Sequence, residues 1–358
     1  MTCMLLVRTD IKAQSRAALL RTDRLPAGFG PSQLQSAYKL PSSTAGAGET
    51  VAVVDAFNDP NAVADVAHYR STYGLPACNA STGAGCLSVV NQNGAASPLP
   101  KNSGTTGWAT EESLDVDMVS AICPKCHIIL AESNSATTKS LGTAVNAAVS
   151  LGAVAVSNSY GGSQSANDGT FDNLYYKHAG VAVTASAGDS GFGVSYPSAS
   201  QWLTSVGGTS LRTASSTRGW TETVWNGSGG GCSTASESRA SWQQVVPGCK
   251  HRTDNDVAAV ADPNTGVAMY DTYDQGGFIV VGGTSVSSPI IASVFALGGT
   301  PSAGTFPTAD IYAHTGSLFD VTMGSNGTCT HTILCTAGVG YDGPTGWGTP
   351  NGTAAFTG

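Results

Sequence analysis

The chain has 358 residues, of which 41% are hydrophobic and only 11% are charged, with a formal net charge of −8 at pH 7. This composition is typical of a globular protein with a large buried core. The acidic balance and the lack of any lysine- or arginine-rich block argue against nucleic acid as a partner. No stretch approaches the ~20 apolar residues that span a membrane, so no membrane partner is expected.

The first 25 residues are expected to form a tail, or the remnant of a leader or propeptide. Basic residues lie among scattered apolar ones without a clear period: Arg8, Lys12, Arg16, Arg21 and Arg24. The run from Met4 to Val7 is too short for the apolar region of a signal peptide, so an export signal would lie upstream. Residues 26–358 contain no repeat or linker and are expected to form a single domain.

From residue 50 onward, apolar runs alternate with helical stretches. Thr50 to Asp55 is almost wholly apolar, as in a parallel strand buried on both faces. Further strands are expected at 87–90, 127–131, 154–157 and 181–185, and helices at 33–38, 61–73, 110–122, 141–151 and 172–178. This alternation predicts an α/β fold, with a parallel sheet and helices on both faces. Active sites of such sheets lie at the carboxyl ends of the strands.

The last third of the chain is less regular. Residues 200–280 contain four tryptophans and the glycine run 229–231, which indicates hairpins and loops. The apolar run Phe278 to Val281 then predicts a buried strand, and Pro289 to Leu297 predicts a buried helix.

The cysteines fall into close pairs in loops rich in glycine and serine. The pairs are Cys78 with Cys86, Cys123 with Cys126, Cys232 with Cys249, and Cys329 with Cys335, which leaves Cys3. Such local pairs favour disulfides in an oxidising compartment. The alternative is a zinc or redox site at Cys123 and Cys126 with His127. A redox pair usually opens a helix, whereas a strand is expected after Cys126, so the disulfide is preferred.

Ser285 follows a glycine pair and Thr284, between the predicted strand and the predicted helix. A hydroxyl at a helix N-terminus meets free N–H groups that favour developing negative charge, which suits a nucleophile. The alternative is that Ser285 only caps the helix.

A serine nucleophile needs a base, and none of the six histidines lies in a recognisable catalytic motif. Glu111 and Asp115 are four residues apart, so on a helix they share a face and can share a proton. The alternative is a solvated acidic face. Asp189 follows a predicted strand and, when protonated, would donate a hydrogen bond to an oxyanion; otherwise it only forms a turn.

The ordered motifs resemble the catalytic domain of the sedolisin family, the serine-carboxyl peptidases, in its kumamolisin-like form. The matches run from about residue 25 to residue 355: Glu111 to Asp115, Ala187 to Gly191, Tyr196-Pro197, Val206 to Ser210, Val224 to Asn226, Ala261 to Pro263, and Gly283 to Ser285 followed by Pro289. The resemblance implies a subtilisin-like parallel sheet with helices on both faces.

The resemblance also implies roles for four residues. Ser285 would be the nucleophile, Glu111 the general base, Asp115 the residue that orients Glu111 and shares its proton, and Asp189 the oxyanion partner. Unperturbed carboxyl pKa values near 4 and the need for a protonated Asp189 predict an acidic optimum. Ser210 ends a second Gly-Gly-Thr-Ser and is assigned no catalytic role.

Substrate is expected to add a strand at Ser159, Tyr160 and Gly161. Many members of the family have Trp where this chain has Tyr160, which predicts a changed subsite.

A single structural calcium ion is expected near the C-terminus. Two carboxylates among small residues suit a hard cation that takes about six oxygens. The resemblance implies the carboxylates of Asp320 and Asp342 and the backbone carbonyls of Val321, Gly338 and Gly340 as its ligands.

The sequence therefore predicts a secreted acid endopeptidase that acts on protein or peptide substrates as a monomer. Relatives carry a long inhibitory prodomain, and only about 25 to 40 residues precede the catalytic domain here, so a removed prodomain or a misplaced gene start is expected. The alternatives are an inactive, calcium-stabilised binding or structural protein and a neutral Ser-His-Asp hydrolase.

Overall fold

A large sheet runs through the centre of the computed structural model, which describes residues 1–15, 25–234 and 237–358. The strand order is β10-β9-β8-β6-β3-β5-β4, and β13 also pairs with β9. Only β10 runs antiparallel to its neighbour. The strands are β3 (Thr50–Ala56), β4 (Leu87–Asn91), β5 (His127–Ser133), β6 (Ala155–Asn158), β8 (Ala182–Ser186), β9 (Thr204–Thr213), β10 (Trp220–Val224) and β13 (Val257–Val260).

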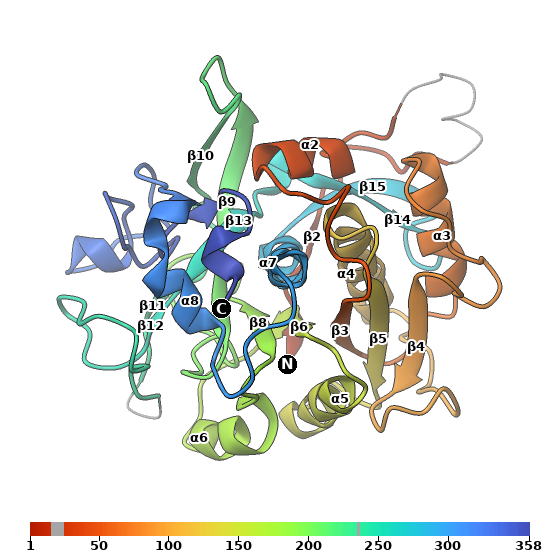
Figure 1. The fold of residues 1–358 in the computed structure, drawn as a ribbon, viewed down its shortest axis with the longest axis horizontal. Helices are drawn as coiled ribbons and strands as arrows, with labels where there is room; N and C mark the ends of the chain where they lie inside the picture. Colours follow the sequence, from red (N-terminus) through yellow and green to blue (C-terminus); the bar gives the residue numbers. More distant parts are fainter. Residues whose placement is uncertain (16–24, 235–236) are drawn as a thin grey trace.

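Helices cover both faces of this sheet, because successive side chains of its strands enter two different cores. Val51 and Val53 of β3 belong to one core, whereas Ala52 and Val54 belong to the other. The first core includes α2 (Pro31–Ala37), α3 (Ala62–Thr72), α4 (Trp108–Ile122) and α7 (Thr284–Gly298). The second includes α5 (Thr138–Ser150), which lies on the other side of the sheet (Figure 1). The predicted α/β fold with helices on both faces is confirmed.

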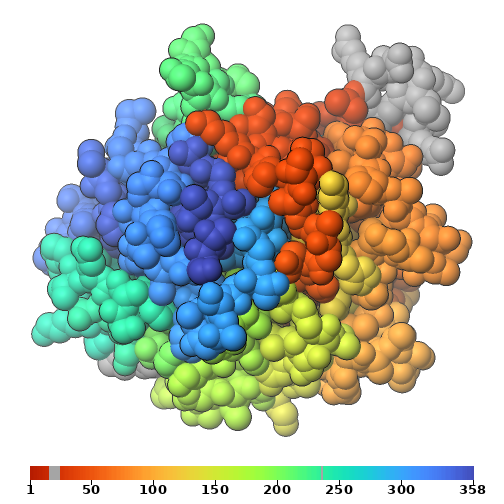
Figure 2. Space-filling model, viewed as in Figure 1, coloured from red at the N-terminus to blue at the C-terminus, as the bar shows by residue number. Residues whose placement is uncertain are grey.

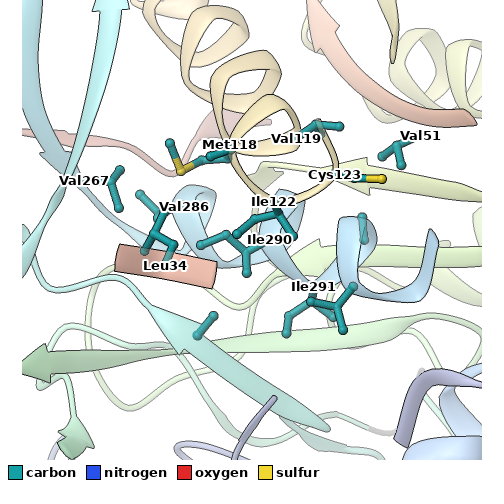
Figure 3. Packing of buried hydrophobic residues seen from close by; sticks show 14 of the residues in the cluster. Leu34, Val51, Met118, Val119, Ile122, Cys123, Val267, Val286, Ile290 and Ile291 are labelled. Atoms are coloured by element: carbon teal, nitrogen blue, oxygen red, sulfur yellow. The ribbon is translucent and has the colours of Figure 1, made fainter. Parts of the chain in front are cut away.

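Helices α4 and α7 pack side by side in the middle of the first core (Figure 3). Met118 and Ile122 of α4 and Val286 and Ile290 of α7 are fully buried there. Every residue of α4 is buried, its acidic residues included. The polar ends of two enclosed helices are therefore held at fixed positions relative to each other and to the sheet.

Smaller elements surround the main sheet. The small sheets contain β14 (Val267–Asp271), β15 (Gly277–Gly282) and β2 (Leu6–Val7); β1 (Thr2–Cys3) and β7 (Tyr160–Gly161); β11 (Gly231–Cys232) and β12 (Thr253–Asp254); and β16 (Leu318–Phe319) and β17 (Thr349–Pro350). The short helices are α6 (Asp168–Phe171), a π-helix (Asp172–Tyr176), α8 (Thr308–Ala313), and single turns at Pro263–Thr265, Thr315–Ser317, Thr332–Leu334 and Ala354–Phe356.

Three predicted elements differ from the observed ones. The helix expected at 172–178 is a short α-helix followed by a π-helix. Residues 200–280 are not mainly surface hairpins, because β9 and β13 enter the main sheet and are largely buried. The strand at Phe278 to Val281 is buried as expected, but it pairs with β14 and β2 outside the main sheet. Local apolarity predicts burial in each case and leaves the pairing partner open.

The segment after α2 closes the surface over the central helices. Figure 2 shows it in red between the blue residues of α7 and the yellow and orange residues of α4 and α3. Gly46 in this segment lies directly against the Cys123–Cys126 disulfide and Leu297.

The four expected disulfides are present, at Cys78–Cys86, Cys123–Cys126, Cys232–Cys249 and Cys329–Cys335, and Cys3 is free. The Cys123–Cys126 pair is buried as a disulfide, and the His127 ring is engaged in a hydrogen bond with the Ser88 hydroxyl. This arrangement disfavours the zinc or redox alternative. None of the described helices combines the length and the apolar character that crossing a bilayer requires.

Residues 1–15 are also placed against the domain, although 16–24 lie outside the described residues. The chain end marked N in Figure 1 lies near β6 and β8, and β1 pairs with β7 just beyond β6. The tail expected over residues 1–25 therefore begins with two short strands.

Candidate active site

Ser285 lies in the first turn of α7, directly after β15 and the turn residue Gly283. Gly283 has φ +102°, and a Cβ there would collide with the Met4 carbonyl and with Asp189 Oδ2, so only glycine fits. The buried Ser285 hydroxyl donates to the Ser159 carbonyl at 3.3 Å, and its backbone N–H donates to the Met4 carbonyl at 3.0 Å. The hydroxyl thus stands at a helix N-terminus, where negative charge is favoured.

Helix α7 begins five residues earlier than the predicted start at Pro289. Proline has no N–H to donate to the carbonyl four residues before it, which is that of Ser285. The Ser159 hydroxyl donates to Asp115 Oδ1 at 2.7 Å, and its oxygen also lies 3.4 Å from this free carbonyl. Ser159 therefore lies between the start of α7 and Asp115 of α4.

Glu111 and Asp115 are fully buried on α4. Burial raises the pKa of both carboxyls well above the ordinary value, and the nearby Asp55 raises them further. The Ser159 hydroxyl donates to Asp115 Oδ1 and lowers the pKa of Asp115, whereas both carboxylate oxygens of Glu111 are buried without a hydrogen-bond partner. The predicted acidic pair is thus enclosed, and Ser159 links Asp115 to Ser285, so the solvated-face alternative does not hold.

Asp55 is an acidic member of this group that the sequence reasoning missed. It lies at the end of β3, is fully buried, and neither of its carboxylate oxygens has a hydrogen-bond partner. Burial raises its pKa to about 8. The available signal was a single acidic residue at the carboxyl end of an otherwise apolar strand, where functional groups of parallel sheets gather.

Asp189 follows β8 and reaches the same helix N-terminus. Its Oδ1 accepts from the Thr284 N–H at 2.7 Å and from the Thr284 hydroxyl at 2.9 Å. Its Oδ2 is shielded from solvent and has no partner. Burial raises the pKa of Asp189 to about 7, despite the opposing hydrogen bonds. Below that pH, Oδ2 therefore carries a proton that it can donate towards an oxyanion beside Ser285.

The predicted substrate-binding residues lie at the carboxyl end of β6. Ser159 contacts both Ser285 and Asp115, and Tyr160 and Gly161 form β7. The buried Tyr160 hydroxyl donates to Asn158 Oδ1 at 2.7 Å, and its ring lies 6.3 Å from that of Trp108. The edge of β7 pairs with Thr2 and Cys3 of the same chain.

Other groups that could form a serine-based site lie elsewhere. The rings of His127, His178 and His314 bond to Ser88, Tyr175 and Asp310, respectively. Among the residues that the structure describes, no histidine ring bonds to the Ser285 hydroxyl. Ser210 lies in β9 and donates to Asp262 Oδ2 at 2.6 Å, so it stays without a catalytic role. This arrangement argues against a Ser-His-Asp site.

Two pairs of the predicted calcium ligands contact each other in the C-terminal loops. The Gly340 N–H donates to Asp320 Oδ2 at 2.8 Å, and the Gly338 N–H donates to Asp342 Oδ2 at 3.0 Å. A Cβ added at Gly338 would meet nothing within 4 Å, so there is open space beside this loop. Within the described ranges no three histidine, cysteine or acidic side chains gather as metal ligands, so a cation would depend on two carboxylates and on backbone carbonyls. Such an all-oxygen set fits calcium.

Comparisons with known proteins find consistent relatives. Residues 90–310 match the model of the subtilase family. Sedolisin from Pseudomonas sp. (strain 101) is 29% identical over 360 residues, which cover 90% of this chain and 59% of that protein. Kumamolisin from Bacillus sp. (strain MN-32) is 29% identical over 379 residues, covering 96% of this chain and 64% of that protein. The chain thus spans about three fifths of the length of these relatives.

The fold is also similar to that of a solved structure, Pseudomonas sedolisin, a serine-carboxyl proteinase in complex with two molecules of pseudo-iodotyrostatin. The TM-score is 0.74 at 24% sequence identity, and the match covers 91% of this chain and 96% of the other. This likeness supports the subtilisin-like arrangement of sheet and helices.

Proposed function

Since the chain belongs to the subtilase family and contains a sedolisin-family domain, we propose that it is a serine-carboxyl endopeptidase that cleaves protein or peptide substrates at acidic pH. One observation carries the proposal: the Ser285 hydroxyl stands at a helix N-terminus, and Ser159 links it to the buried Asp115, one turn along α4 from the buried Glu111. A serine hydroxyl next to a proton acceptor and facing backbone N–H groups is the arrangement that acyl transfer needs.

In the proposed mechanism, Glu111 and Asp115 share one proton, so the pair keeps one ionised carboxylate that takes the hydroxyl proton through Glu111 while Ser285 Oγ attacks the substrate carbonyl carbon. The oxyanion accepts hydrogen bonds from the Ser285 N–H and from protonated Asp189 Oδ2. The C–N bond then breaks, and the leaving amine takes the proton from Glu111. Water repeats these steps on the acyl-Ser285 ester and releases the acid.

The pH–rate profile tests this mechanism. Asp189 is neutral below its raised pKa of about 7 and becomes a like charge facing the oxyanion above it, so activity is expected to fall as the pH rises through about 7. Asp189→Asn keeps a donor that cannot ionise, so its lower activity should not show this fall. Asp189→Ala is expected to lose about 10²–10³-fold in kcat. Rates of hydrolysis of a denatured protein from pH 2.5 to 8 measure all three.

Asp262→Asn is the control for this series, because Asp262 binds Ser210 outside the site. Its pH profile should match that of the unmodified chain. A rate that rises towards pH 8 would support a neutral hydrolase instead. No cleavage at any pH by folded protein would favour an inactive, calcium-stabilised binding or structural homologue.

We also propose one structural calcium ion, held by the carboxylates of Asp320 and Asp342 and by the carbonyls of Val321, Gly338 and Gly340. It would join the loop around Asp320 to the loop at 338–342 and take no part in the chemistry. The proposed location of the protein is extracellular, which the four disulfides support. We propose that it acts as a monomer.

Calcium is expected to raise the melting temperature by about 3–4 °C, since a ligand at 100 times its Kd stabilises by about 2.7 kcal/mol. Thermal unfolding at pH 6, with millimolar calcium or with a chelator, measures the shift. A Ser285→Ala background prevents self-digestion. Asp320→Asn should remove the response, and magnesium should give a smaller one because it demands octahedral geometry. Equal melting temperatures with calcium and with chelator would contradict the site.

A further inference from the structure

Asn255 is fully buried, and its side-chain amide bonds to three separate parts of the chain. Its Oδ1 accepts the hydroxyl of Ser205 in β9 at 3.1 Å. Its Nδ2 donates to the carbonyls of Gly229 at 3.1 Å, Gly343 at 2.9 Å and Pro344 at 3.0 Å. A buried amide that is bonded on both sides fixes the backbone groups around it. The Gly229 carbonyl is therefore held in a fixed position relative to the main sheet.

Gly229 lies against the turn at residues 187–191, which carries Asp189 and is called the Asp189 turn below. The Gly229 N–H donates to the Gly188 carbonyl at 2.7 Å. A Cβ placed on Gly229 would collide with the Ala187 carbonyl, so the two backbones touch without a side chain between them. The Gly188 carbonyl and the Asp189 nitrogen belong to one planar peptide unit. A shift of the Gly229 backbone would therefore pass directly to Asp189.

Two sets of hydrogen bonds hold the Asp189 turn. On one side, Thr284 of α7 accepts the Gly188 N–H at 3.0 Å and donates to Asp189 Oδ1 at 2.9 Å. On the other side, segment 227–230 binds the Gly188 carbonyl. This segment also accepts the Gly191 N–H at 2.8 Å, beyond Asp189. Thr284 thus fixes Oδ1, whereas the direction of Oδ2, which has no partner, depends on the backbone of the turn.

Segment 227–230 depends on its neighbours for its position, because three of its four residues are glycines. A Cβ placed on Gly230 would lie 2.9 Å from Asn255 Nδ2, and one on Gly207 of β9 would lie 2.8 Å from it. The Asn255 amide thus fills a slot between the sheet and the segment that glycine leaves open. Asn326 Nδ2 also binds the segment, at 3.0 and 3.3 Å, but its Oδ1 has no partner. Asn255 connects the segment to β9 through both ends of its amide.

We propose that Asn255 is a positioning residue, which holds segment 227–230 and through it the Asp189 turn, so that Asp189 Oδ2 faces the oxyanion. The inference rests on the proposed function and adds to it a residue that acts through the backbone of the turn. The oxyanion exists only after Ser285 Oγ has attacked. A misdirected Oδ2 would therefore weaken binding of the tetrahedral intermediate and leave binding of the substrate unchanged.

The kinetic test uses Asn255→Leu, which removes the amide and keeps a side chain of similar size. Its kcat at pH 4 is expected to fall by about 10–100-fold, the order of loss that small displacements of a catalytic group cause. KM should stay within about threefold of that of the unmodified chain, because only the transition state is affected. Initial rates against substrate concentration measure both constants. A folded Asn255→Leu chain that keeps its kcat would overturn the proposal.

Asn255→Asp is a second variant that keeps the shape of the side chain. A buried carboxyl is protonated at pH 4 and still donates one hydrogen bond, so this variant should recover part of the kcat that Asn255→Leu loses. Circular dichroism establishes whether each variant is folded. A folded Asn255→Asp chain as slow as Asn255→Leu would contradict the donor role of the amide.

A double-mutant cycle with Asp189→Ala separates positioning from a general structural defect. If Asn255 acts through Asp189, its replacement has little to disturb once the Asp189 carboxyl is gone. In the Asp189→Ala chain, Asn255→Leu should therefore lower kcat by less than about threefold. A loss of about 10–100-fold in both backgrounds would show that Asn255 acts independently of Asp189 and would overturn the proposal.

Asn91→Leu is the matched control. Asn91 is also buried, and its Nδ2 donates to the Pro98 carbonyl at 2.9 Å. It lies in β4, far along the strand order from β9. Asn91→Leu is expected to lower the free energy of unfolding and to keep kcat within about threefold. An equal loss of kcat in Asn91→Leu and Asn255→Leu would point to a general effect and contradict the proposal.

Hydrogen exchange in the Ser285→Ala chain tests the structural link without any activity. The amides of residues 188–193 are expected to exchange about 10-fold faster when Asn255→Leu is added, whereas those of β5 keep their rates. If these rates and kcat are both unchanged in folded protein, the positioning proposal fails and the peptidase proposal stands. If the unmodified, folded chain cleaves no peptide at any pH, the peptidase proposal fails, and the role of Asn255 fails with it.

Discussion

Ser285→Ala is expected to lower kcat for peptide hydrolysis by about 10⁴–10⁶-fold, as loss of the nucleophile does in other serine peptidases. The reason is geometric: the Ser285 hydroxyl lies in the first turn of α7 and bonds to Ser159, which also contacts the buried Asp115. The remaining rate would come from binding and from the N–H groups that polarise the carbonyl. Active-site titration and initial rates at pH 4 measure the loss.

Ser210 provides a matched control, because it ends the same four residues, Gly-Gly-Thr-Ser, at 207–210. Ser210 lies in β9, and its hydroxyl donates to Asp262 Oδ2. Ser210→Ala is expected to retain kcat within a few-fold. If Ser285→Ala kept more than a tenth of the activity, another nucleophile would have to be sought.

Raising the pH from 4 to 8 is expected to lower the free energy of unfolding by several kcal/mol, at about 1.4 kcal/mol per unit of pKa difference. The cause is a cluster of buried carboxyls at the ends of β3 and β5. Asp55 and Glu132 are register partners there, and Glu112 Oε2 accepts the Asp59 N–H at 2.8 Å. Burial raises the pKa of Asp55 to about 8, of Glu132 to about 9 and of Asp59 to about 7, and that of Glu112 well above its usual value.

The direction of this pH dependence follows from the number of protons that each state binds. Because the pKa values of these carboxyls are higher in the folded protein than in the unfolded chain, the folded protein binds more protons between about pH 4 and pH 9. The stabilisation is complete at pH values below about 4, the pKa of these carboxyls in the unfolded chain. It is lost as the pH rises through their pKa values in the folded protein. A second buried cluster has the same sign, since burial raises the pKa of Glu237 to about 9 and of Asp254 to about 7. The expected stability at acidic pH and the proposed activity at acidic pH thus have a common cause, which is the desolvation of buried carboxyls.

Urea unfolding at pH 4, 6 and 8 in the Ser285→Ala background measures this dependence. Glu132→Gln is expected to flatten it, because the amide has no proton to lose. Glu49→Gln is the control, since Glu49 is partly exposed and contacts the Thr300 hydroxyl at the surface. A free energy of unfolding that is constant or rises from pH 4 to pH 8 would show that these carboxyls ionise inside the fold at little cost.

Local sequence was sufficient to predict much of the architecture. The spacing of apolar residues and the runs of β-branched residues indicate whether a segment is a buried strand or a buried helix. The run at 50–55 is a strand with alternate side chains in two cores, and 110–122 lies within the wholly buried α4. The close cysteine pairs needed no long-range information, since loops of 3 to 17 residues bring their ends together. The assigned roles of the four site residues stay predictions, although the fold places all four around one helix end.

Tertiary structure decided which segments pair and which groups share an enclosed site. Strand β15 pairs outside the main sheet, and β13 pairs with β9 inside it. Both pairings are made by backbone N–H and C=O groups. Every residue except proline has both groups, so the residue types do not indicate which strands will pair. Asp55 joins the acidic group only because the carboxyl end of β3 meets α4. Residues 1–7 show no pattern in sequence, and their place at Ser285 also rests on backbone hydrogen bonds. Side-chain pattern therefore determined what is buried, and long-range backbone pairing determined what lies against the nucleophile.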